Sequence, residues 1–140
     1  MSDIKSKLVF EDYIVEKVEL NANLECDKDD IDIKFDIDSD VNFVNENDFL
    51  LNLSVEIFKD AKKNNFPFSL SVMLTGIFSI KGVKQEEKMD YAEKNAVAIL
   101  FPYVRALVTN YTAASNISPL ILPPINVAQY LQNKRKQAKK

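Results

Sequence analysis

The segment AVAILFPYVRALVTNYTAA, residues 96–114, carries one charged side chain, that of Arg105, within a longer run of helix-forming residues from Glu86 to Ala114. Its apolar residues recur at helical spacing in two neighbouring stripes, one formed by Ala96, Leu100, Tyr103, Leu107 and Tyr111 and the other by Val97, Phe101, Val104 and Val108. A helix this apolar must be covered on more than one side. Pro102 predicts that the helix kinks or restarts at that position.

The residues before this helix alternate between apolar and polar side chains, as strands with one buried face do. Four runs show this pattern, over residues 8–20, 31–43, 51–57 and 66–80. In the first and weakest run, one face holds Phe10, Ile14, Val18 and Leu20 and the other holds Tyr13 and Val15. Short polar connections at 45–48 and 62–65 predict hairpins. The chain is therefore expected to be an α+β domain in which a four-stranded antiparallel sheet is backed by the long helix.

A single sheet covers one side of the long helix, so its other side is expected to face a partner subunit. The segment that follows the helix, residues 117–126 with the sequence ISPLILPPIN, is apolar and broken by prolines. Two interpretations of this segment are open. It is either a buried loop that caps the core or the wall of an apolar groove, because prolines hold a loop extended and leave few backbone donors to satisfy.

Asn126 is placed to cap a last, short helix from Val127 to about Gln132. The chain then ends in the basic sequence NKRKQAKK. We expect residues 134–140 to form a solvated, frayed terminus and not a site for RNA or lipid, since the run is short and lacks interleaved aromatic residues. Residues 1–7 are expected to be frayed as well. The length of 140 residues predicts one domain, spanning residues 1–140.

The composition excludes several classes of protein. A net charge of −3 argues against a nucleic-acid-binding surface. The single cysteine, Cys26, has no intrachain partner for a disulfide, which is typical of a cytoplasmic protein. No apolar run is long enough to span a membrane, and the start of the chain lacks the apolar core of a secretory signal. We therefore expect a cytoplasmic protein without membrane insertion.

The residue inventory also argues against catalysis. The chain contains no histidine, which removes histidine-based acid–base chemistry and most zinc sites, and its two glycines cannot form a phosphate-binding loop. The acidic string Asp36, Asp38, Asp40 resembles the start of a calcium loop, but the sixth and twelfth positions hold Val41 and Asn47 where glycine and glutamate are needed. It is better explained as the solvated face of a strand. No catalytic residue, metal or cofactor is expected.

Four separated segments together resemble the SecB family of chaperones. They are IKFDID at 33–38, GIFSI at 76–80, ILFPYVR at 99–105 and LILPPINV at 120–127, and their order and spacing also agree with the family. The resemblance covers roughly residues 8–132. It implies the sheet-and-helix fold, assembled as a homotetramer in which two dimers pack through their long helices. It also implies an ATP-independent holdase that wraps unfolded polypeptides, either preproteins for export or an aggregation-prone antitoxin.

The resemblance also implies which residues form the sites. The client groove would contain Ile33, Phe35 and Ile37 from one strand, Phe68 and Leu70 from another, and Ile117, Leu120 and Leu122 from the loop. Val97, Phe101, Val104 and Val108 are the candidate subunit interface.

Docking of the translocase motor is less well supported by the sequence. Family members that serve export use acidic residues on the sheet surface, but the matching positions here are Lys17, Asn21 and Ser71. A displaced acidic patch would involve Glu16, Glu19 and Asp38. Two other functions are open to the same fold: an oligomeric adaptor that binds one folded partner, and a small-molecule enzyme, for which the chain offers no convincing catalytic set.

Overall fold

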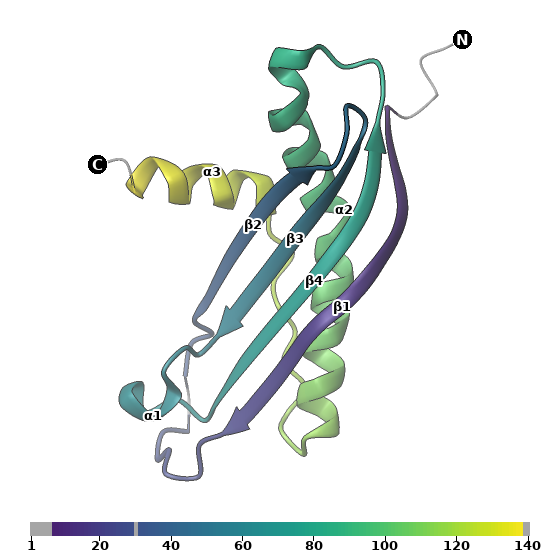
Figure 1. The fold of residues 1–140 in the computed structure, drawn as a ribbon. Helices are drawn as coiled ribbons and strands as arrows, with labels where there is room; N and C mark the ends of the chain where they lie inside the picture. Colours follow the sequence, from purple (N-terminus) through teal and green to yellow (C-terminus); the bar gives the residue numbers. More distant parts are fainter. Residues whose placement is uncertain (1–6, 30, 139–140) are drawn as a thin grey trace.

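The computed structural model describes residues 7–29 and 31–138 (Figure 1). In chain order the elements are β1 (Leu8–Ala22), β2 (Phe35–Phe43), β3 (Asp48–Ile57), the one-turn helix α1 (Ala61–Asn64), β4 (Phe68–Ile80), the long helix α2 (Gln85–Ala114) and the shorter helix α3 (Val127–Ala138). The four strands form one antiparallel sheet in the order β1-β4-β3-β2. The α+β fold expected from the sequence is thereby confirmed.

The long helix α2 runs along one face of the sheet (Figure 1), and the core lies between them. In β3 every second residue is buried, from Phe49 to Ile57, so these five apolar side chains point to α2. Gly76 in β4 lies where α2 approaches closely. A Cβ atom there would be 2.6 Å from Phe78 Cε1 and 2.7 Å from Leu100 Cδ1, so the absence of a side chain allows this packing.

The strand β1 carries two irregularities that change which side chains face the core. Its pairing with β4 shifts between Phe10 and Asp12 and again between Val15 and Lys17. Each shift inserts an extra residue, which reverses the alternation of side chains. Tyr13 therefore packs against the core, while Ile14 is 56% exposed. The prediction that Ile14 shares a buried face with Phe10 is wrong for this reason.

Other element boundaries differ slightly from the prediction. The strand β2 begins at Phe35, so Ile31 and Ile33 precede it as half-buried residues packed on the core. The connection at 62–65 contains the single turn of α1. The helix α2 continues without interruption through Pro102, which lies on its exposed side, so the helix does not restart there.

The C-terminal helix is longer than expected. As predicted, Asn126 caps its start, since the backbone N–H of Gln129 donates to Asn126 Oδ1 at 3.0 Å. The helix does not end near Gln132 but continues to Ala138, so the prediction of a frayed terminus is wrong for residues 134–138. Residues 1–6, 139 and 140 lie outside the described part of the chain. Within that part, no helix is long and apolar enough to cross a membrane.

Candidate functional site

Sheet register brings the predicted groove residues of β2 and β4 onto one face. Phe35 pairs with Ile57 of β3, and Ile57 pairs with Leu70 of β4, so the three form one row across the sheet. Ile37 lies in the next row on the same face, opposite Val55. The predicted residues of the two strands are thus neighbours on the side of the sheet that faces α2.

An aromatic cluster lies at the end of this row. The ring of Phe58 is 4.8 Å from that of Phe66 and 5.2 Å from that of Phe68, measured between centroids. Phe58 has a φ of 54°, a left-handed conformation that is rare for a bulky residue and is retained because its ring is buried. A cavity of about 160 Å³ next to the cluster is lined by Phe35 and Phe66 among others. The sequence carries no signal for the conformation of Phe58, and this residue was missed.

Three side chains of α2 hold the loop 117–126 in an extended conformation. The Nε and Nη2 atoms of Arg105 both donate to the carbonyl oxygen of Leu122, at 3.0 and 2.9 Å. Thr109 Oγ1 donates to the carbonyl oxygen of Leu120, and the backbone N–H of Leu120 donates to Thr112 Oγ1, each at 2.9 Å. These contacts satisfy loop backbone groups that would otherwise be buried without partners. Arg105, the only charge in the apolar half of the helix, therefore positions the loop.

Because the loop 117–126 is extended, successive side chains point in opposite directions. Leu122 is only 2% exposed and belongs to the core, whereas its neighbour Ile121 is 66% exposed. Leu122 and Phe68, which were both predicted for the client groove, are therefore buried in the free protein. One side of the loop caps the core, as the first interpretation predicts, and the other presents the side chain of Ile121 to solvent. The groove interpretation stays a prediction.

The eight predicted groove residues divide into two groups by exposure. Ile33, Phe35, Ile117 and Leu120 are half-buried, and Ile37, Phe68, Leu70 and Leu122 are buried. All eight belong to the core or pack directly against it.

The four residues predicted for a subunit interface lie inside the chain's own core. Val97, Val104 and Val108 have no exposed surface, and Phe101 is 5% exposed. They are covered by other residues of the same chain, so the prediction that they contact another subunit is wrong. The neighbouring stripe is divided: Ala96 and Leu100 are also buried in the core, whereas Tyr103 is 38% and Tyr111 is 44% exposed. Both stripes have helical spacing, and spacing alone could not tell which of their residues the chain itself buries.

A cavity of about 440 Å³ lies between α2 and the start of α3. Its apolar lining includes Phe101, Pro102 and Ile125, and its basic lining includes Lys94 and Arg105.

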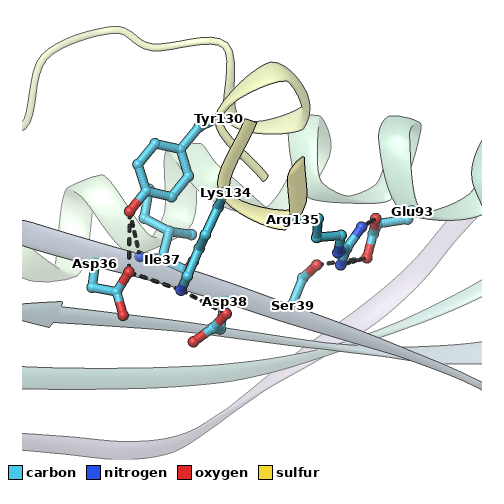
Figure 2. Close-up of polar contacts among 8 residues, drawn as sticks. All are labelled: Asp36, Ile37, Asp38, Ser39, Glu93, Tyr130, Lys134 and Arg135. Carbon is cyan, nitrogen blue, oxygen red and sulfur yellow. Dashed lines mark hydrogen bonds and ion pairs between the residues drawn. The ribbon is translucent and has the colours of Figure 1, made fainter. Parts of the chain in front are cut away.

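Polar side chains of α3 contact both β2 and α2 (Figure 2). Lys134 Nζ is 2.8 Å from Asp36 Oδ1 and 2.8 Å from Asp38 Oδ1. Arg135 forms a two-point ion pair with Glu93 of α2, with Nη2 at 2.7 Å from Oε2. Two successive residues thus reach two different elements. These ion pairs join this part of α3 to β2 and to α2.

Two further polar contacts complete the arrangement. The Tyr130 hydroxyl donates to Asp36 Oδ1 at 3.1 Å, and Ser39 Oγ donates to Glu93 Oε2 at 2.8 Å. Burial by itself raises the pKa of Asp36, but the hydrogen bond and charge of Lys134 outweigh it and hold that pKa below its ordinary value. The pKa of Glu93 is likewise raised by burial and lowered more strongly by Arg135 and Ser39. Both carboxylates are therefore stabilised in their charged form.

The strand β2 presents Asp36, Asp38 and Asp40 from regular extended backbone, which confirms the strand-face interpretation of this string. Asp38 and Asp40 line a hollow of about 490 Å³ together with Glu16 of β1. Of the residues proposed for a displaced acidic patch, Glu16 and Asp38 are thus brought together.

Glu19 and Ser71, which lie on the same face of the sheet, each contact a charged neighbour. Glu19 Oε2 lies 3.6 Å from Lys17 Nζ, so this carboxylate has a cation beside it. Ser71, at a position matched to family acids, donates to Glu56 at 3.0 Å.

Comparisons with known proteins identify the family. A family model described as preprotein translocase subunit SecB matches residues 6–138. An uncharacterized protein of Methanocaldococcus jannaschii, MJ0357, is 38% identical over 133 residues, covering 92% of this chain and 85% of that protein. The protein-export protein SecB of Alcanivorax borkumensis is 32% identical over 79 residues, covering 56% of this chain and 50% of that protein. For the SecB of Orientia tsutsugamushi the identity is 27% over 107 residues, covering 76% and 66%.

The fold is similar to that of a solved structure, the Mycobacterium tuberculosis Rv1957 SecB-like chaperone in complex with a ChAD peptide from the Rv1956 HigA1 antitoxin. The TM-score is 0.67, and the superposition covers 85% of this chain and 88% of the other. The sequences are 14% identical, so this likeness concerns the fold alone.

Proposed function

Because the chain belongs to the SecB family, whose members are chaperones and not enzymes, we propose that it is an ATP-independent holdase that binds unfolded polypeptides. The observation that carries this proposal is the set of half-buried apolar residues on the α2 side of the sheet, namely Ile33, Phe35, Ile117 and Leu120. Apolar side chains that are partly exposed to solvent in this way mark a surface that can bind another apolar chain. The exposed side chain of Ile121 extends the surface along the loop.

The buried members of the predicted groove, Ile37, Phe68, Leu70 and Leu122, lie in the core beneath these residues. They contact a client where a covering segment moves aside. Such a surface selects apolar, extended segments with little discrimination among side chains. This property suits a protein whose clients share only the lack of a fold.

The clients we propose are unfolded preproteins or an antitoxin. Relatives named protein-export protein SecB favour the first class, and a similarly folded chaperone solved with an antitoxin peptide favours the second. Docking of a basic segment of the translocase motor is disfavoured at Lys17, Asn21 and Ser71, because these side chains offer no carboxylate. The surface with Glu16, Asp38 and Asp40 is the alternative position.

We propose a homotetramer, formed as a dimer of dimers in the cytoplasm. The side of α2 that carries Leu107 and Tyr111 provides the contact, since Tyr111 is 44% exposed and Leu107 is only half-buried.

The test is suppression of aggregation in the absence of nucleotide. Several unrelated proteins are unfolded in denaturant and diluted into buffer with and without this protein, and light scattering is recorded. A holdase is expected to reduce scattering for most of them at a ratio of about one oligomer per client. Protection of a single protein would favour the adaptor, and protection of none would contradict the proposal.

A further inference from the structure

The C-terminal helix α3 occupies the free edge of the sheet. The strand β2 is at one edge, and an edge strand offers backbone groups to which an extended peptide can add. At Ile37 both groups are taken by α3. The backbone N–H of Ile37 donates to the Tyr130 hydroxyl at 3.3 Å, and its carbonyl oxygen accepts from Lys134 Nζ at 3.1 Å. An extended polypeptide and α3 therefore cannot both pair with the β2 edge at Ile37.

The same helix also covers apolar residues assigned to clients. Val127 and Leu131 of α3 are buried in the core, and the Tyr130 ring lies 5.9 Å from that of Phe35. Phe35 and Ile37 thus lie beside or beneath α3. A client that reaches them must first displace the helix.

The attachment of α3 is weak enough to be reversible. The helix has 12 residues, of which two are buried, and isolated helices of this length are marginal in water. Its other contacts to the domain include the ion pairs of Lys134 and Arg135, whose side chains are 34% and 50% exposed, while Glu93, the partner of Arg135, is 18% exposed. Ion pairs with a solvent-exposed partner contribute modestly and are screened by salt. The helix therefore opens more readily than the sheet it covers.

We infer that α3 is a latched strap that competes with the client for the β2 edge, and that Lys134 and Arg135 are the latch. This inference rests on the proposed holdase function and names the regulation of its site. The apparent affinity for a client is the intrinsic affinity multiplied by the fraction of molecules in which α3 is open. Loss of both ion pairs is expected to raise that fraction, and hence the affinity, about fivefold.

The test uses the full chain with two measurements. Backbone amide exchange of residues 127–138, followed by mass spectrometry, reports opening of α3. Binding of reduced, carboxymethylated α-lactalbumin, a permanently unfolded probe, reports access for clients. The variant Lys134→Gln/Arg135→Gln is expected to exchange several-fold faster in this segment and to bind the probe about fivefold more tightly. Lys136→Gln removes the same charge from an exposed neighbour and is expected to change neither result.

A second variant, in which the two charges of one ion pair are exchanged, controls for misfolding of the double glutamine variant. In Glu93→Arg/Arg135→Glu the ion pair is restored with opposite polarity, so amide exchange and probe affinity are expected to return towards the wild-type values. Agreement of the swap with wild type, and of the double glutamine variant with faster exchange, supports the latch.

Three outcomes contradict the inference, and they separate it from the proposed function. Unchanged exchange in the double glutamine variant means that the ion pairs do not hold α3. Faster exchange with unchanged affinity means that α3 does not exclude clients, while the holdase function stands. If neither wild type nor any variant binds this probe or a second unfolded protein, the holdase function fails, and control of client access fails with it.

Discussion

The neighbours Ile121 and Leu122 provide a direct test of how the loop is built. The same substitution at the two positions, Ile121→Gln and Leu122→Gln, places a polar side chain on opposite sides of one extended segment. Leu122 is 2% exposed and Ile121 is 66% exposed. The first variant should therefore affect what the protein binds, and the second should affect whether it folds.

The magnitude for Leu122 follows from its burial. Removing a buried leucine forfeits about 2 kcal/mol of transfer free energy, and burying an amide without a hydrogen-bond partner costs a further ~1–3 kcal/mol. We expect Leu122→Gln to lower the free energy of unfolding by about 3–5 kcal/mol, a large part of the stability of a domain this size. Ile121→Gln should change it by less than about 0.5 kcal/mol.

Urea unfolding followed by circular dichroism measures both stabilities, and the change in midpoint is compared at constant slope. Binding of the unfolded probe at low temperature is measured on the same samples. If Ile121 contacts clients, its replacement should weaken binding by about 1 kcal/mol, or roughly fivefold. A Leu122→Gln variant that stays within 1 kcal/mol of wild type and loses client binding would refute the assignment of Leu122 to the core.

Four further predictions concern the core, the loop and the latch. Gly76→Ala should lower stability by about 1–3 kcal/mol in urea unfolding, because the added methyl collides with side chains of β4 and α2; a neutral result would mean that α2 lies farther from the sheet. Val104→Asp should unfold the chain and not merely dissociate an oligomer, since the residue is buried in its own core; a folded monomer by sedimentation would contradict this. Arg105→Lys should cost about 1 kcal/mol by replacing a two-donor fork with one ammonium, and Arg105→Met should cost more in the same assay. The pKa values of Asp36 and Glu93 are lowered by folding, so their stabilisation is present above their unfolded pKa values and is lost as pH falls below about 4; the loss between pH 6 and pH 3 should shrink in Asp36→Asn/Glu93→Gln, and an equal loss in that variant would exclude these carboxylates.

The stripe of Val97, Phe101, Val104 and Val108, which was predicted as a subunit interface, shows what helical periodicity cannot decide. Helical spacing identifies residues that share a face of α2, but two adjacent stripes had the same spacing. The core includes Val97 and Val104 of one stripe but also Leu100 of the other, and Tyr103 and Tyr111 of that second stripe are left partly exposed. Aromatic residues with a polar end are suited to a partly wet surface, and that property was the available signal.

The alternation of apolar and polar residues also gave a wrong prediction in β1, where an extra residue reverses which side chains face the core. In β1 the two irregularities in pairing with β4 turn Tyr13 inward and Ile14 outward. The residues at such irregularities have no distinctive composition, and their position depends on the partner strand. The loop gave a similar case, since the hydrogen bonds of Arg105 to Leu122 decide which side chains of the alternation point inward.

The sequence by itself determined the elements of this protein and the family to which it belongs. Period-two alternation in β3 and β4 and helical spacing in α2 reflect burial of one face, a property carried by neighbouring residues. Only the tertiary structure decided which residues of the proposed groove are buried and which elements cover them. The row from Phe35 to Leu70 depends on strand register, and the helix at 134–138 depends on carboxylates of Asp36 and Glu93 that lie far away in the chain. Such contacts are set by how the elements pack, and local sequence does not contain that information.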